Sequence, residues 1–438
     1  MSLTLLASLT FVLIIAAVIF VRPWLGLSLL VLLGAAGKLA ILPEFDWDLM
    51  DVVAAITAWS ALVYLLFQRK GFRASALDAP LLLLGGAVLL NLPRAAGPAD
   101  FISGLRFLVL LVIYFLGVLL LDTQEKVRSA LVALVVAAGS IAALSLVLFV
   151  TGTNRFSWLG TQVSYSEGGL GRYRVGGPFE QPNTFAQIMV IAVPLGLALV
   201  LATRGRQRWL FGALTSASLI CAFLTQSRSA VLGVLFGLAL VLYATRKARS
   251  RAFSVAAALM LCAVALGSSL GTAEQLLWRL NRRGVAAEVQ PESSLNRRKI
   301  LVASLEVLSE NPLGVGYGQA RRFIGAKLGV TSKSAHNILL GWGVEFGILG
   351  LVAGCWLFIR QVRMLAKVAK TSHDNVGLLA AGCLGAVSAT WIHNMFHATL
   401  HSGFVWIFFA AASAVCLLSV QVPRQVPLRA GSRMPVPA

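Results

Sequence analysis

Long apolar runs, separated by short polar connections, recur along almost the whole chain. Each run holds about 18 or more mostly apolar residues, which is enough for a helix to cross a bilayer. A segment in hydrocarbon must satisfy its own backbone hydrogen bonds, so helices fit this pattern, whereas the alternating strands of a membrane β-barrel do not. We predict an all-α polytopic membrane protein with about twelve transmembrane helices, or about thirteen if the first run, 3–21, also crosses. The other predicted spans are residues 24–42, 50–67, 79–93, 105–121, 128–151, 184–203, 209–225, 230–245, 252–271, 337–359, 376–396 and 402–420.

Composition agrees with this class. Apolar residues make up 58% of the chain and charged residues 12%, against roughly 25% charged residues in soluble domains. The first run has neither a basic region before it nor an A-x-A cleavage site after it, which favours a retained helix over a removed signal peptide. The cysteines all lie inside apolar runs, which favours packing roles over disulfides or a thiolate metal site. They are Cys221, Cys262, Cys355, Cys383 and Cys416.

Lysine and arginine concentrate in alternate connections between the predicted spans. Short cytoplasmic loops of membrane proteins are enriched in these residues, so these connections predict the cytoplasmic side. They are residues 69–73, 204–208, 246–251 and 360–370. The intervening connections then face outward, including the two long ones, 152–183 and 272–336. This sidedness accounts for most of the +20 net charge without nucleic acid, and it predicts a bacterial inner-membrane protein.

The same assignment predicts six regions along the chain. They are N-terminal transmembrane helices (1–151), a periplasmic loop (152–183), central transmembrane helices (184–271), a large basic periplasmic loop (272–336), C-terminal transmembrane helices (337–420) and a cytoplasmic tail (421–438).

The larger outward loop, 272–336, breaks the charge pattern because it is itself basic, with Arg321 and Arg322 among its cations. One explanation is a soluble cap with a chance basic bias. The alternative is a site for an anionic substrate at the outer membrane face. The planar fork of arginine pairs with two phosphate oxygens at once, which suits a diphosphate.

Further arginines lie close to the predicted outer face. Arg174 precedes the span that opens at Asn183, within a segment whose glycines and proline favour an ordered irregular turn. Arg228 lies at a tight junction between two spans, where a charge is costly unless it is paired or reaches the interface. Apolar spacing predicts a helix over 296–311, and Arg297 falls on its apolar face, beside Arg298.

The span that follows the basic loop opens with His336 and Asn337 and carries an ionisable residue, Glu345, within it. Ionisable residues inside spans are candidates for function, although Glu345 is equally suited to pairing with another helix. A histidine at a helix start is commonly a cap or a packing residue. His336 becomes a candidate because it shares the outer face with the arginines.

At these residues the chain resembles the O-antigen ligase/polymerase superfamily. The first two matching pieces are Arg174-Val-Gly-Gly-Pro-Phe-Glu-Gln-Pro-Asn183 and Ser227-Arg228-Ser229. The others run from Arg297 through Asn311-Pro-Leu-Gly-Val-Gly316 and from His336-Asn-x-x-Leu339 to Glu345-x-Gly347. The order of the pieces, rather than any single one, carries the resemblance, which covers roughly residues 150–360.

The resemblance implies a GT-C-like fold and a reaction without a cofactor or metal. Family members move a glycan from undecaprenyl diphosphate to a hydroxyl on the periplasmic side, with inversion. Ligases use a sugar of lipid A-core, and polymerases use another repeat unit; the ligases are the closer match. By the same resemblance, Arg228 and Arg297 would hold the diphosphate and His336 would position or deprotonate the acceptor hydroxyl. The implied substrate-binding residues are Arg174, Asn183, Arg298, Arg321, Arg322, Asn337 and Glu345.

Two other classes remain open from the sequence. Asp46-Trp47-Asp48 spells the D-x-D of metal-dependent oligosaccharyltransferases, because hard cations favour paired carboxylates. His393, His397 and His401 could share one helical face for zinc, although packing or acceptor contacts fit their position better. A transporter of the lipid carrier would also use outward cations, but it predicts internal repeats that this chain does not show.

Overall fold

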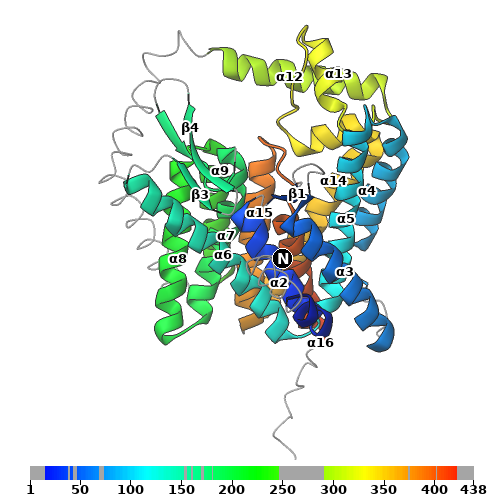
Figure 1. Ribbon diagram of the computed structural model, residues 1–438. Helices are drawn as coiled ribbons and strands as arrows, with labels where there is room; N and C mark the ends of the chain where they lie inside the picture. The colour runs from blue at the N-terminus through cyan, green and yellow to red at the C-terminus, as the bar shows by residue number, and fades with distance from the viewer. Residues whose placement is uncertain are drawn as a thin grey trace, which may run out of the picture.

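The computed structural model describes residues 15–37, 40–42, 47–68, 74–151, 155–158, 161–168, 172–179, 181–245, 291–372, 375–400 and 402–421. The predicted span 252–271 lies outside these ranges, as do Asp46, His401 and most of the run 3–21, whose residues 15–21 are helical. The described residues form a bundle of packed helices (Figure 1). The helices of the first half are α2 (Pro23–Ala36), α3 (Leu49–Gln68), α4 (Asp78–Asn91), the 3-10 turn η2 (Leu92–Arg94), α5 (Pro98–Leu120) and α6 (Gln124–Val150). Those of the second half are α7 (Pro182–Ala202), α8 (Gly205–Leu224), α9 (Arg228–Ala244), α12 (Pro291–Glu310), α13 (Ala320–Lys327), α14 (Ile338–Thr371), α15 (Asn375–Asn394) and α16 (Gly403–Gln421).

The predicted class, an α-helical membrane protein that crosses more than once, is confirmed. Among the described residues, 6 helices are long and apolar enough to cross a membrane, namely α5, α6, α7, α8, α14 and α15. Four shorter apolar helices, within α2, α3, α9 and α16, accompany them. The count of about twelve spans stays a prediction.

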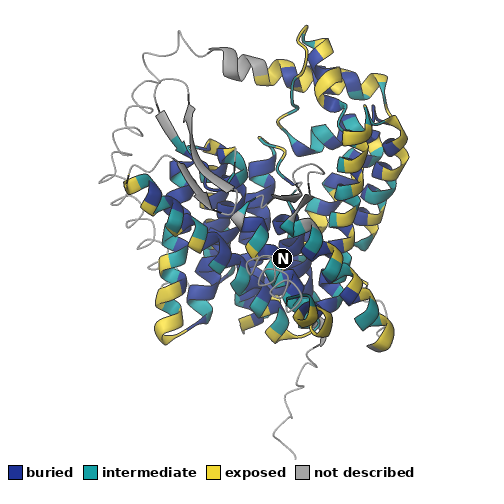
Figure 2. Cartoon of the chain, in the orientation of Figure 1, coloured by how far each residue is buried: buried dark blue, intermediate teal, exposed yellow. Residues whose placement is uncertain are grey.

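Helices α7 and α15 form the centre of the bundle, where dark-blue buried residues gather in Figure 2. In each of them 89% of the most apolar stretch is buried by other helices. Small residues allow this packing: a Cβ built at Gly233 of α9 would lie 2.7 Å from the Ala389 carbonyl oxygen of α15. At Gly237 the same construction falls 2.7 Å from the Gly385 carbonyl oxygen. Close backbone approach of this kind is how membrane helices gain contact area where no water drives them together.

Two small antiparallel sheets lie in connections for which no strands were predicted. Strand β1 (Ala40–Leu42) pairs with β2 (Trp47–Asp48), and β3 (Arg155–Trp158), β4 (Thr161–Gly168) and β5 (Arg172–Val175) form a meander. The predicted irregular turn around Arg174 is therefore wrong for its first half, since Arg174 pairs with Ser166 of β4. The β-branched and aromatic residues of β4 and β5 favour strand, whereas the glycines and proline act only after Val175.

Helices α12 and α13, which we call the cap, cover one end of the bundle and are largely exposed (Figures 1 and 2). The helix predicted over 296–311 is present as α12, which ends just before Asn311 and Pro312. The short helix α13 was not predicted.

Helix α14 extends well beyond the predicted span 337–359, because it continues to Thr371. The residues predicted as a cytoplasmic loop, from Arg360 to Lys370, are helical instead. Their apolar positions recur every three or four residues and include the buried Leu365 and Val368, so one face of this extension packs on the bundle.

Connections predicted to face outward contact one another at the capped end. Arg94 donates from Nη1 to the Gly314 carbonyl oxygen at 3.1 Å, which joins the α4–α5 connection to the basic loop. Arg174 donates from Nε to the Thr225 carbonyl oxygen at 2.9 Å, which joins the other long connection to the α8–α9 junction. These contacts support a common side for the connections.

Candidate active site

The junction between α8 and α9 is tied to the end of α15 by a buried histidine. Gln226 has a positive φ of 53°, so the chain reverses there before α9 begins at Arg228. The Ser229 hydroxyl lies 3.0 Å from Nδ1 of His393, and Nε2 of His393 lies 3.1 Å from the Asn183 carbonyl oxygen. A carbonyl only accepts, so Nε2 carries the proton and Nδ1 accepts from Ser229. A neutral His393 therefore joins α7, α9 and α15.

Arg174 ties the strand meander to the same junction. Besides its bond to the Thr225 carbonyl oxygen, its Nη2 donates to Oδ1 of Asn183 at 3.2 Å. The guanidinium group is half-buried, and this burial lowers the pKa of Arg174 from its usual value. Two predicted residues, Arg174 and Asn183, are thus in direct contact, and His393 links them to the Ser227-Arg228-Ser229 junction.

A second histidine, His397, lies beyond the end of α15 and beside the first. The two imidazole rings are 4.9 Å apart between centroids. Burial, followed by the nearby His393, His336, Arg297 and Arg174, lowers the pKa of His397 to about 3. His397 is therefore neutral at ordinary pH, and two arginines from separate segments of the chain, Arg174 and Arg297, lie close enough to affect it.

The cap supplies Arg297 to this group. Its guanidinium carbon lies 5.6 Å from the centroid of the Phe396 ring, over the face of the ring. The rest of the side chain is exposed. Arg297 is therefore held above the turn that follows α15, where its charge reaches both His336 and His397.

His336 occupies a strained position immediately before α14. Its φ of 51° lies in the left-handed region, which is uncommon for a residue with a side chain. Partial burial, followed by the charges of Arg297, Lys333 and Arg321, lowers the pKa of His336 below its ordinary value of 6.5. A neutral imidazole at neutral pH is able to accept a proton, which is what a general base requires.

Asn337 has a structural role that the sequence did not indicate. Its side-chain oxygen accepts from the Leu340 backbone N–H at 3.1 Å and caps the start of α14. Its Nδ2 also contacts Sδ of Met395 at 3.7 Å, on the turn that carries His397. The cap bond fixes the backbone next to His336.

Two of the motif pieces, around Gly314 and Gly347, dock against each other. Helix α14 breaks at Gly347, whose φ of 71° and ψ of −161° are open to glycine alone. The break removes the helical donors for the Val344 and Glu345 carbonyls. The backbone N–H groups of Val315 and Gly316 replace them, at 2.9 Å and 3.1 Å.

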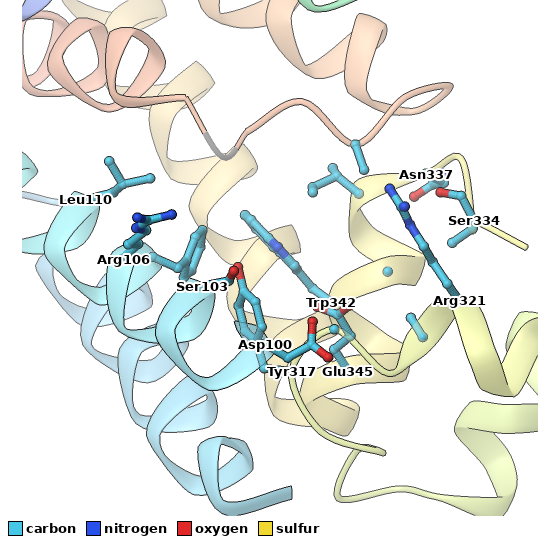
Figure 3. Close-up of a pocket in the computed structure, with 17 residues that line it drawn as sticks. Asp100, Ser103, Arg106, Leu110, Tyr317, Arg321, Ser334, Asn337, Trp342 and Glu345 are labelled. Atoms are coloured by element: carbon cyan, nitrogen blue, oxygen red, sulfur yellow. The ribbon is translucent and has the colours of Figure 1, made fainter. Parts of the chain in front are cut away.

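The Glu345 carboxylate lies in the wall of a cavity between α5 and the start of α14, together with Asp100, Arg106 and Arg321 (Figure 3). The Gly318 backbone N–H hydrogen-bonds to Glu345, and Arg321 and Asp100 are its charged neighbours. Arg321 of the cap is thus a charged neighbour of Glu345, although no ion pair joins the two among the described residues.

The structure does not gather all of the predicted residues. Arg298 and Arg322 are exposed on the cap, and within the part of the chain that the structure describes no hydrogen bond or ion pair joins them to the histidines. Arg228 is exposed at the start of α9, beside the serines that bond to one another and to His393. Arg321 belongs to the cavity wall rather than to the group around His397.

A comparison with known protein families matches part of the chain. A model of the O-antigen ligase family matches residues 213–354, about a third of the chain. This part of the chain is similar to that family. The matched residues extend from α8 to the first half of α14 and include Arg228, Arg297, His336 and Glu345.

Two further comparisons are less informative. No curated protein matches this chain. A solved structure of a peptidoglycan synthase complex, described for its coordination of polymerization and crosslinking, aligns with 78% of this chain and 97% of its own, with 17% identity and a TM-score of 0.42.

Residues outside the matched range complete the site, above all His393, and the sequence did not indicate its partners. His393 and His397 were noticed for their helical spacing and considered as zinc ligands. Helix α15 ends at Asn394, so His397 is not on a helical face with His393, and that assumption is wrong. The role of His393 follows from its bonds to Ser229 and Asn183, which no local pattern contains.

Proposed function

We propose that this protein is an O-antigen ligase, an inverting glycosyltransferase that moves glycan from undecaprenyl diphosphate to a hydroxyl of lipid A-core. The observation that supports it best is that Arg174, Arg297 and His336 all lie near the turn after α15, at the capped end. Arg174 is linked to it through Asn183 and His393, Arg297 lies over Phe396, and Asn337, next to His336, contacts Met395. These groups come from three of the four motif pieces, and the fourth, Arg228, starts the helix whose Ser229 bonds to His393. We further propose that this end faces the periplasm of an inner-membrane protein.

The electrostatics of the cluster suit a diphosphate. Apart from burial, the groups that lower the pKa values of His336 and His397 are all arginine, lysine or histidine. A site with one sign of charge and low-dielectric walls concentrates ligands of the opposite sign. In our proposal Arg228 and Arg297, both exposed, bind the two phosphates, and Arg174 adds its field from the buried side.

The transfer is a displacement at the anomeric carbon. The acceptor oxygen forms a new bond to that carbon while the bond to the diphosphate oxygen breaks, and the electron pair leaves with undecaprenyl diphosphate. The negative charge that grows on the leaving oxygen is stabilised by Arg228 and Arg297. The proton of the acceptor hydroxyl passes to the neutral His336. Attack from the side opposite the leaving group inverts the anomeric centre.

The function is tested by supplying purified protein, in EDTA, with undecaprenyl-diphosphate-linked glycan and lipid A-core. We expect glycan on the core. Longer lipid-linked chains with none on the core would make the protein an O-antigen polymerase that uses the same site. Activity restored only by divalent metal would direct attention to Asp46 and Asp48 and contradict the metal-independent mechanism. Movement of the carrier across the membrane with no transfer would indicate a transporter.

A further inference from the structure

A cavity of about 440 Å³ lies between α5 and the first turns of α14 and is closed on one side by the cap. Its volume falls within the roughly 300–1,000 Å³ range of small-molecule sites. Figure 3 shows Asp100, Tyr317 and Glu345 together at one end, with Arg106 on the α5 side and Arg321 near Asn337. The proposed transfer does not use these residues.

The cavity wall combines aromatic rings with hydrogen-bonding groups of both kinds. Tyr317 and Trp342 contribute ring surface and are 7% and 1% exposed. Asp100 and Glu345 accept hydrogen bonds, whereas Arg106 and Arg321 donate them. A pyranose ring has apolar faces and hydroxyl groups around its edge. Aromatic rings suit the faces, and the hydrogen-bonding groups suit the hydroxyls.

Trp342 gives independent evidence for a ligand. Its indole Nε1 is buried and has no hydrogen-bond partner among the described residues. A buried donor without a partner is destabilising, so such groups usually serve a ligand or an ordered water. Gly341, one residue earlier, lines the same cavity, and no heavy atom lies within 4 Å of a Cβ built there. The backbone therefore leaves room in the cavity at Gly341.

The cavity adjoins the proposed transfer site. Asn337 lines the cavity and directly follows His336, and Ala398 lines it and directly follows His397. A glycan with one ring in the cavity would thus extend towards the two histidines. The carboxylates of Asp100 and Glu345 disfavour a phosphate at the end where they lie.

We propose that this cavity binds one uncharged pyranose unit of a substrate glycan, through Asp100, Glu345, Trp342 and Arg321. The proposal rests on the proposed function for the source of the sugar, which is either the transferred glycan or the acceptor core. It assigns the cavity a specificity role, because the ring held there decides which glycan reaches His336.

Filling the cavity tests the proposal. In Gly341→Leu the new side chain occupies open space at a helical position, so the fold is retained while the sugar is excluded. Gly212→Leu in α8 is the matched control, since its Cβ also meets nothing within 4 Å and Gly212 does not line the cavity. Trp342→Phe keeps an aromatic ring and removes the N–H. Binding of two soluble probes, lipid-free core oligosaccharide and O-antigen repeat oligosaccharide, is measured by saturation-transfer NMR in detergent.

We expect Gly341→Leu to weaken binding of one probe at least tenfold and Trp342→Phe to weaken it about three- to tenfold, as for one lost hydrogen bond. Gly212→Leu should bind like the wild type. The affected probe identifies the source of the sugar, and the KM for the same substrate should rise in the transfer assay. Binding that depends on Gly341 in a protein without transfer activity would support the cavity and refute the ligase. Unchanged binding and KM in both cavity variants, with transfer intact, would overturn the cavity proposal alone.

Discussion

Adding a single methyl group at Gly347 should strongly destabilise the site. In Gly347→Ala the backbone would keep a φ of 71° and a ψ of −161°, at a cost of about 1–3 kcal/mol for a residue with a side chain. The added Cβ would also collide with the Pro312 carbonyl oxygen, which is backbone and cannot rotate away. The 312–316 segment must then move.

That movement stretches the bonds from the Val315 and Gly316 N–H groups to the Val344 and Glu345 carbonyls, each of which contributes about 0.5–1.5 kcal/mol. The total loss is therefore about 3 kcal/mol or more. We expect a clearly lower midpoint of thermal unfolding in detergent, together with reduced transfer, because Glu345 and the cap shift together. Gly341→Ala, in the same helix and in open space, is the control and should be neutral or stabilise by up to about 1 kcal/mol. A wild-type midpoint for Gly347→Ala would refute the account of the break.

Three further outcomes follow from the site. Ser229→Ala leaves Nδ1 of His393 without its donor and should cost about 1–3 kcal/mol in unfolding free energy, while Ser229→Thr should retain more of it. Because the pKa of His336 is lowered, its imidazole is mostly neutral at pH 7 and becomes charged as the pH falls, so the acid decline of kcat/KM should have its midpoint below pH 6.5. An equally steep acid decline in His336→Asn would assign the decline to another group. If the basic cap binds the acceptor core, neutralising three cap cations should raise the KM for the acceptor core, and an unchanged acceptor KM would contradict that role of the cap. The three are Arg321, Arg322 and Lys327.

Hydropathy and charge were sufficient for the class of fold, because a helix that crosses a bilayer needs a long apolar run wherever it packs. They were insufficient at the ends of elements. The extension of α14 to Thr371 rests on an amphipathic face that packs on the bundle, and a span predicted from hydropathy stops where the first arginine appears. The strands before Val175 were missed because turn-forming residues nearby dominated the interpretation.

The sequence identified the motif residues of the site, but it did not indicate which of them contact one another. The pairing of Arg174 with Asn183 and the docking of Gly314 on Gly347 join residues that local patterns treat separately. His393 was misjudged because its partners, Ser229 and Asn183, lie far away in the sequence. Lys327, another cation of the basic loop, forms an ion pair with Glu310 across the cap, so part of the loop's basic charge serves structure.

The most direct test of the central claim is the single-turnover rate of glycan transfer to lipid A-core in three alanine variants, at Arg228, Arg297 and His336. Loss of a group that stabilises a developing charge or moves a proton costs roughly 10²–10³-fold in rate. We predict losses of this size in all three, with donor binding weakened mainly in the arginine variants. Lys299→Ala, which removes an exposed cation two residues from Arg297 on α12, is the control and should retain wild-type transfer. Wild-type rates in the three variants, or an equal loss in Lys299→Ala, would contradict the proposed site.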